Sequence, residues 1–176
     1  VARLDSALGN GWRASARRMA DRLDDPGLTA LAEARIGLRA GAEGVDTLIA
    51  AVPDDMADDP GLAYERFRWR LANDQRDGAV DLIIDRSASA ARLGRPEPWA
   101  DDRRDLARAL MREGDHATAY AVAAAHHLAE GTAYADLEWL SGYLALRFLD
   151  APDKALEHFR RFRLAVDTPI SRSEEH

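Results

Sequence analysis

The feature that most constrains this sequence is the spacing of its apolar residues, which recur every three or four positions along almost the whole chain. That spacing is the period of a helix with one buried face, whereas a half-buried strand alternates apolar and polar residues. No stretch of the sequence sustains such alternation. Alanine, the residue with the highest helix propensity, supplies 35 of the 176 residues. The sequence therefore predicts an all-α protein.

Pro, Gly and Asp residues mark the ends of the expected helices, as in the segments Asp25-Pro26-Gly27 and Gly114-Asp115. The pattern predicts helices over residues 12–23, 28–39, 44–51, 61–73, 78–87, 99–113, 116–128, 134–149 and 152–166. Most connections are short, so neighbouring helices are expected to pack antiparallel. The longest irregular stretch, 88–98, is expected to connect N-terminal hairpins within 1–87 to C-terminal hairpins within 99–171. Residues 172–176 follow no period and are set apart as a tail that need not belong to the natural protein.

A weak internal repeat accompanies this pattern. Ala119 and Ala155 open the second helix of two consecutive pairs and are 36 residues apart, and small residues occupy similar places at Ala79, Gly44 and Ala16. A small side chain where two helices cross, at intervals of roughly 34 residues, is typical of tetratricopeptide-like hairpins. We therefore expect about four or five antiparallel hairpins stacked into a curved superhelix, or solenoid.

Composition excludes several classes of function. The chain contains no cysteine, which excludes disulfides and thiolate metal sites. A formal net charge of -7 argues against nucleic acid as the main partner, because that binding requires a basic surface. No apolar run approaches the roughly 18 residues that a membrane span needs.

The histidines do not predict a metal site. His126 and His127 are adjacent, so on a helix they would point about 100° apart, whereas two ligands on one helix need a spacing of three or four residues. His116 and His158 stand alone. We expect hydrogen-bonded or partly exposed histidines, with no metal and no cofactor.

Glu138 is the carboxylate of most interest because it lies beside Trp139. In apolar surroundings, its pKa would be raised, as in a glycosidase acid. The favoured alternative is a hydrogen bond or an ion pair with an Arg of the neighbouring hairpin. The sequence carries no Ser/His/Asp order, no glycine loop for phosphate and no HExxH motif.

Candidate ligand-binding residues lie at the start of the C-terminal half. Arg103, Arg104 and Arg108 share one expected helix and could hold an anionic polymer, although pairing with neighbouring acids is favoured. Trp99 opens that helix after Pro98, and it is the aromatic residue expected to be exposed. The other aromatic residues have core spacing, and we expect Trp139→Ala to cost roughly 3 to 5 kcal/mol if the indole is buried.

Motifs in the C-terminal half resemble, in order, the α-superhelical region of soluble lytic murein transglycosylases. They are residues 92–99 (RLGRPEPW), 103–108 (RRDLAR), 114–120 (GDHATAY), 138–147 (EWLSGYLALR), His158-Phe159 and 168–171 (TPIS). The structural motif residues of this resemblance are Glu138, Trp139, Gly142, Ala145, Leu146, Arg147, His158 and Phe159. In the N-terminal half, residues 48–53 (LIAAVP) and 60–64 (PGLAY) with Trp69-Arg70 resemble the preceding part of the same region.

This resemblance implies a periplasmic protein that acts on peptidoglycan. In such enzymes a helical superhelix curves into a ring and carries a lysozyme-like domain. One Glu of that domain acts as acid and then as base to cleave the bond between N-acetylmuramic acid and N-acetylglucosamine, leaving a 1,6-anhydro end. The partners implied are a glycan strand, the enzyme's own catalytic domain and other cell-wall proteins.

The sequence departs from the family at its catalytic segment. The Glu-Ser pair followed by a Gly-Leu-Met-Gln run is absent, so no residue of this chain inherits the catalytic role. Because the sequence stops just after Ser171, we expect a fragment of the superhelix that scaffolds or guides substrate, with self-association through its exposed ends. The alternative is a stand-alone tetratricopeptide-like adaptor that binds another protein.

Overall fold

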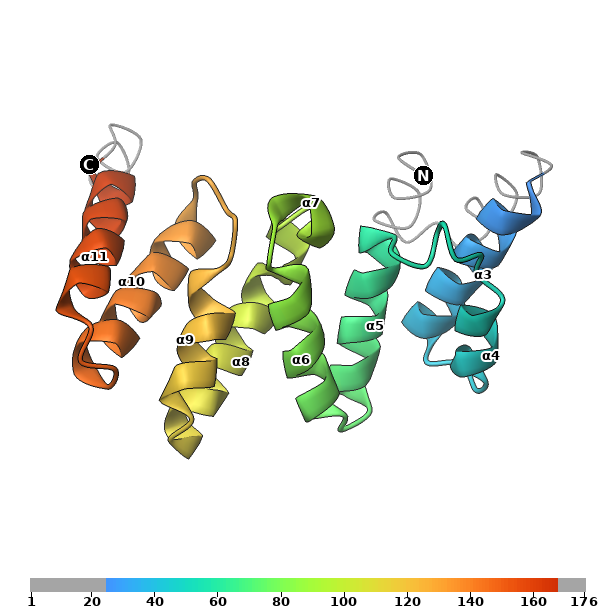
Figure 1. Ribbon diagram of the computed structural model, residues 1–176, viewed down its shortest axis with the longest axis horizontal. Coiled ribbons are helices and arrows are strands. Elements are labelled where there is room, and N and C mark those ends of the chain that lie inside the picture. The colour runs from blue at the N-terminus through green and yellow to red at the C-terminus, as the bar shows by residue number, and fades with distance from the viewer. Residues whose placement is uncertain (1–24, 168–176) are drawn as a thin grey trace, which may run out of the picture. The chain divides into compact units, whose positions relative to one another are not determined.

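The computed structural model describes residues 25–167 (Figure 1). Within that range, all regular secondary structure is helical and comprises nine α-helices and one 3-10 helix. The prediction of an all-α protein is confirmed for these residues. The expected helix over 12–23, with Ala16, lies outside the described residues, as do Thr168-Pro169-Ile170-Ser171 and the tail.

The chain divides into two compact units, residues 1–82 and 83–176. From residue 25 onward, the helices that begin in the first unit are α3 (Pro26–Ala40), α4 (Val45–Ala50), α5 (Pro60–Ala72) and α6 (Arg76–Arg86), the last of which ends in the second unit. The second unit continues with α7 (Ala90–Leu93), the 3-10 helix η1 (Glu97–Trp99), α8 (Ala100–Glu113), α9 (His116–Ala124), α10 (Thr132–Arg147) and α11 (Pro152–Val166).

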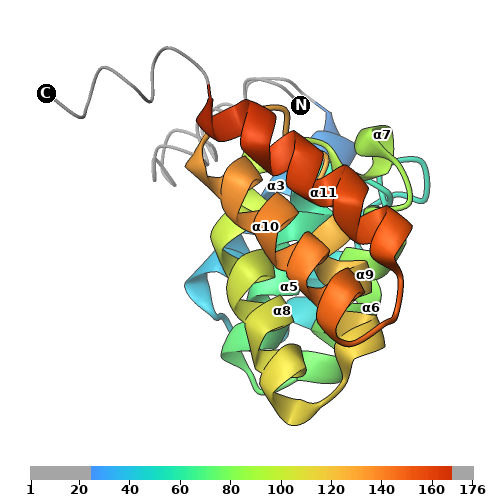
Figure 2. The ribbon, with the colours of Figure 1, turned by 90° about the vertical axis from the view of Figure 1, so that its left-hand side faces the viewer.

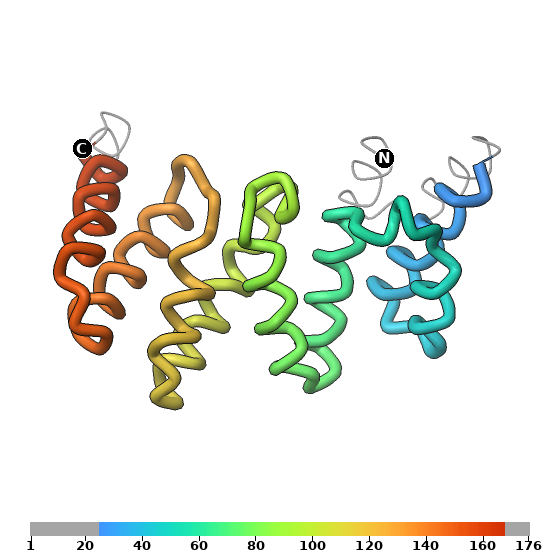
Figure 3. The backbone as a smooth tube through the Cα atoms, in the orientation of Figure 1, coloured from blue at the N-terminus to red at the C-terminus, as the bar shows by residue number. Residues whose placement is uncertain are grey.

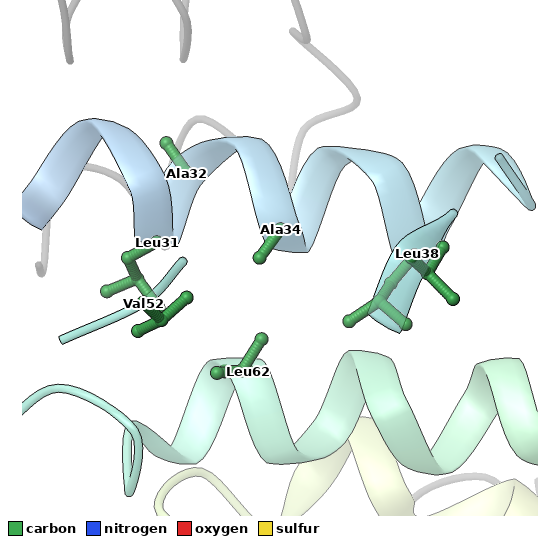
Figure 4. Packing of buried hydrophobic residues seen from close by; sticks show 7 residues of the cluster. Leu31, Ala32, Ala34, Leu38, Val52 and Leu62 are labelled. Carbon is green, nitrogen blue, oxygen red and sulfur yellow. The ribbon is translucent and has the colours of Figure 1, made fainter. Parts of the chain in front are cut away.

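In the first unit, α3 packs on α4 and α5. Asp25 and Asp59 cap the N-termini of α3 and α5, each followed by a proline in the first turn, as the sequence signals predict. Figure 4 shows Leu31, Ala34 and Leu38 of α3 pointing toward Leu62 of α5. These side chains lie on one face of α3 because they are spaced three, four and seven residues apart.

In the second unit, α8 packs on α9, and α10 packs on α9 and α11. The chain turns sharply after Arg147, and α11 returns along α10 (Figures 2 and 3). The two helices approach closely at Gly142, where an added Cβ atom would lie 2.8 Å from the Phe159 ring. Ala145 and Ala155 are buried in the same unit. The small residues of the motif therefore make room for close helix packing.

Several details differ from the sequence expectation. Helix α9 ends at Ala124 rather than at 128, and the stretch predicted to be irregular, 88–98, contains α7 and most of η1. Gly44, expected at a helix crossing, is exposed and precedes α4 with a φ of 72°. A left-handed backbone, not close packing, accounts for the glycine at that position. Among the described residues, no helix combines the length and the apolar character that a membrane crossing requires.

Candidate functional site

The second unit contains a buried network of ionisable side chains centred on Glu138. The carboxylate of Glu138, on α10, lies 3.3 Å from His126 Nε2 through Oε1 and 2.5 Å from His158 Nδ1 through Oε2. The Tyr120 hydroxyl of α9 is 3.1 Å from the other ring nitrogen of His158. The Glu138 side chain is only 4% exposed. Both carboxylate oxygens are therefore occupied by imidazole groups.

Local structure explains how these residues meet. Because α9 ends at Ala124, His126 lies in the connection to α10 and turns toward Glu138 instead of following a helical face. His158 reaches Glu138 because α11 returns along α10. The Tyr134 ring packs edge-on against His126. The carboxylate of Glu138 thus joins the α9–α10 connection, α10 and α11.

The electrostatics of Glu138 differ from those of a glycosidase acid. Burial raises the pKa of Glu138, but the hydrogen bonds and charges of His126 and His158 together outweigh burial and hold the pKa at about 2. Arg161 Nη1 lies 3.7 Å from the same carboxylate. The pKa of Glu138 is therefore lowered and not raised as apolar surroundings alone would have made it, and the favoured polar pairing is found mainly with two histidines. An ionised, enclosed carboxylate has no proton to give to a glycosidic oxygen.

A second buried network of hydrogen bonds is centred on Arg103 of α8. Its guanidinium donates to the backbone oxygen of Val122 at 2.6 Å and to Ser87 Oγ at 2.7 Å. Ser87 Oγ in turn donates to the oxygen of Ile83, and His127 Nε2 lies 2.8 Å from the oxygen of Ser87. Arg103 thus places its positive charge at the C-terminal ends of α6 and α9, where the helix dipole favours a cation.

The burial of Arg103 and of Trp99 corrects two expectations about ligand binding. Arg103 is 1% exposed, and burial lowers its pKa to about 10 while leaving it charged at neutral pH. Trp99 is also 1% exposed, so the expectation that it is accessible is wrong. Trp99 is the last residue of η1, which packs on α8 within the second unit. Neither side chain can contact a polymer at the surface.

The other two candidate arginines remain accessible. Arg104 is partly exposed and lies within 3.5 Å of Asp101, Asp105 and Asp136. Arg108, one turn further along α8, is also partly exposed. The pairing of Arg104 with acids follows the favoured sequence expectation. The same pairing makes Arg104 a weak site for anions, because three carboxylates surround this one guanidinium group.

Aromatic side chains instead form a partly exposed cluster on α10. The Trp139 and Tyr143 rings stack with their planes nearly parallel and their centroids 5.4 Å apart, and Tyr143 packs edge-on against Phe148. His116 stacks on Phe148 at 3.9 Å. Trp139 is 44% exposed. The large loss of stability expected for Trp139→Ala applied only to a buried indole, so it does not apply to this residue.

The motif residues divide into two groups. Glu138, Gly142, Ala145 and His158 are buried, and Phe159 is partly buried against Gly142. Trp139, Leu146 and Arg147 are exposed. The buried group builds the packing of α10 and α11, and the exposed group faces solvent. Within residues 25–167, no group of three or more His, Cys, Asp and Glu side chains has the arrangement of a metal site.

The contacts of Glu138 with His126 and His158 were not predicted from the sequence. Glu138 is 12 residues from His126 and 20 from His158, and neither separation lies within one helix turn. The adjacent histidines are the one sequence feature that indicates this arrangement. Side chains of neighbouring residues cannot share a helix face, but beyond the end of a helix each can contact a different partner. His126 contacts Glu138, and His127 contacts the backbone oxygen of Ser87.

Comparisons with known proteins add no assignment. No model of a known family matches this chain. Searches of curated proteins and of solved structures also find no match. The resemblance to lytic transglycosylases stays a prediction from the sequence motifs.

Proposed function

We propose that this chain is a non-catalytic helical scaffold of a periplasmic lytic transglycosylase, in which stacked hairpins form part of a superhelix that guides peptidoglycan strands. The observation that carries the proposal is the ordered set of motifs between residues 92 and 171. The buried motif residues support it, because they serve helix packing and not an accessible reaction centre. The pKa of about 2 at Glu138 supports the same interpretation.

The surface proposed to meet the glycan lies on α8 and α10, which pack against each other and are joined by the Arg104–Asp136 ion pair. Trp139 presents 44% of its surface there, with Tyr143 stacked against it. The apolar faces of sugar rings pack well on flat aromatic surfaces, and Tyr and Trp also offer a polar group to hydroxyls. Arg108, which is partly exposed on α8, would add hydrogen-bond donors for the carboxylates of stem peptides, whereas Arg104 is already paired with acids.

Retention on purified peptidoglycan sacculi tests this function. We expect the chain to sediment with sacculi, and Trp139→Ala to lower the retained fraction several-fold. Leu164→Ala is the matched control, because Leu164 is an exposed apolar residue on α11. Arg108→Gln should lower retention and its dependence on salt, whereas Arg112→Gln, at an exposed arginine of the same helix, should not. Equal retention of all variants would contradict the proposed surface.

The non-catalytic part of the proposal has a separate test. Soluble products from sacculi incubated with the chain are separated by chromatography and examined for 1,6-anhydro ends. We expect no release above a blank without protein. Release that scales with the concentration of the chain would overturn the scaffold assignment.

A protein-binding adaptor is the second candidate, favoured by the apolar residues on the surface of the second unit. Leu146, Leu156, Leu164 and Val166 are all more than two-fifths exposed. Leu156, Leu164 and Val166 all lie on α11, and apolar side chains that gather into one exposed patch mark surfaces that contact another protein. Absence of retention on sacculi at every salt concentration would favour the adaptor over the glycan guide.

A further inference from the structure

The connection between α9 and α10 is held by two adjacent histidines. His127 has a φ of 56°, a left-handed conformation that is costly for a residue with a Cβ atom. Its ring lies 2.8 Å from the backbone oxygen of Ser87, and the ring of His126 lies 3.3 Å from Glu138. The α9–α10 connection is therefore tied to the rest of the unit through two imidazole rings.

The hydrogen bonds of His126 fix where its proton lies. The backbone N–H of Leu128 donates to His126 Nδ1 at 3.0 Å, so Nδ1 carries no proton. The proton of the neutral ring is then on Nε2 and is donated to Glu138 Oε1. A second proton on this ring would have to bind Nδ1, directly facing the N–H of Leu128. Two donors would then face each other, and the turn would lose its bond.

His158 is placed differently. Its Nδ1 donates to Glu138 Oε2, and its Nε2 faces the hydroxyl of Tyr120. A hydroxyl can donate or accept, so it can rotate to suit either state of Nε2. A second proton on His158 therefore needs only a rotation of the Tyr120 hydroxyl, with the bond to Glu138 kept.

We propose that His126 is an acid-sensitive latch for the α9–α10 connection: protonation of its Nδ1 breaks the bond from Leu128 and loosens residues 125–131, whereas protonation of His158 leaves the connection in place. The asymmetry rests on the partners of the two rings. His126 faces a fixed backbone donor, and His158 faces a rotatable hydroxyl. The inference is independent of the proposed function.

Other ionisable groups surround the latch on each packed element. Helix α10 contributes Glu138 and Tyr134, α9 contributes Tyr120, and α8 contributes Arg103 through its bond to the end of α9. From α11 come His158, Arg161, Glu157 and, over the Tyr120 ring, Lys154. The Glu138 carboxylate contacts both rings, and Arg161 Nη1 lies 3.7 Å from the same carboxylate.

Nuclear magnetic resonance on the full chain tests the latch. Long-range proton–nitrogen correlations of the histidine rings report protonation of each Nδ1 and Nε2 as the pH is lowered. Amide hydrogen exchange of Leu128, corrected for its intrinsic pH dependence, reports the turn. We expect the protection of Leu128 to fall at least tenfold in parallel with protonation of His126 Nδ1. Protection that persists while Nδ1 is protonated would overturn the proposal.

Substitution of the ring separates the latch from general acid unfolding. His126→Asn keeps an acceptor that can receive the Leu128 N–H, as in an Asx turn, and cannot be protonated. In this variant, the protection of Leu128 should not change over the pH range in which it falls in the wild type. His158→Gln is the matched control, and it should keep the pH dependence of Leu128. If His126→Asn loses protection over the same range as the wild type, the latch is not His126.

Discussion

At the scale of single residues, burial and exposure decide what each aromatic or charged side chain does. Trp99 and Trp139 both belong to the second unit, yet one is enclosed and the other is 44% exposed. The sequence pattern places both within expected helices, 99–113 and 134–149. Their contributions to stability should therefore differ, although their chemistry is the same.

Truncation of the two tryptophans measures that difference. We expect Trp99→Ala to lower the free energy of unfolding by about 3–5 kcal/mol, because it leaves a cavity in the packed unit. Trp139→Ala should cost only about 1–2 kcal/mol, since much of its ring already contacts water. Urea unfolding of the two variants and the wild type checks the ranking. Equal costs would contradict the exposures described above.

Glu138 predicts a dependence of stability on acid. Its pKa is about 2 in the folded protein and about 4.5 ordinarily, so the carboxylate stabilises the fold above pH 4.5. This contribution, on the order of 3 kcal/mol, should be lost as the pH falls from about 4.5 to about 2. The measurement is the difference in unfolding free energy between the wild type and Glu138→Gln at a series of pH values. A difference that stays constant across that range would show that Glu138 is not held ionised by its histidines.

At the scale of elements, the packing of α10 on α11 rests on one close approach. An alanine at position 142 would place its Cβ atom 2.8 Å from the Phe159 ring. The higher helix propensity of alanine favours the substitution, but the ring must move within a packed pair of helices. The clash should outweigh the propensity here because three ring atoms of Phe159 lie within 3.0 Å of the new Cβ atom.

We therefore expect Gly142→Ala to destabilise the protein by about 1–2 kcal/mol, as measured by thermal or urea unfolding. Gly78→Ala is the matched control. Gly78 also lies inside a helix, α6, but there an added Cβ atom would make ordinary contacts of 3.5 Å and more. That substitution should be neutral or stabilising by up to about 1 kcal/mol. Addition of Phe159→Leu to Gly142→Ala should recover part of the loss, and no recovery would mean that the ring is not the obstacle.

At the scale of the whole molecule, exposed leucines predict association. Leu156 and Leu164 are 48% and 72% exposed on α11, and Leu146 of α10 is 57% exposed. We expect the sedimentation coefficient of the wild type to rise with concentration, and that of Leu156→Glu/Leu164→Glu to stay constant. The charges should act by making burial of this surface costly. Identical behaviour of the two proteins would mean that these leucines do not drive association.

The sequence alone was sufficient for the helical class and for most helix positions. The caps at Asp25 and Asp59, the prolines that follow them and the three-to-four spacing of apolar residues all act within one or two helical turns. Helix α11 was predicted at its observed bounds, Pro152–Val166. Signals of this kind are local, so they can be read without knowing the neighbours of a segment.

Only the tertiary structure decided which residues are enclosed and which partners they meet. Glu138 meets histidines 12 and 20 residues away, and Arg103 meets the end of α9, 19 residues further along the chain. Such pairings depend on how helices fold back on each other, which short-range spacing does not encode. The same dependence explains why Trp99 is buried and Trp139 is exposed: burial is a property of packed neighbours, not of the residue or its helix.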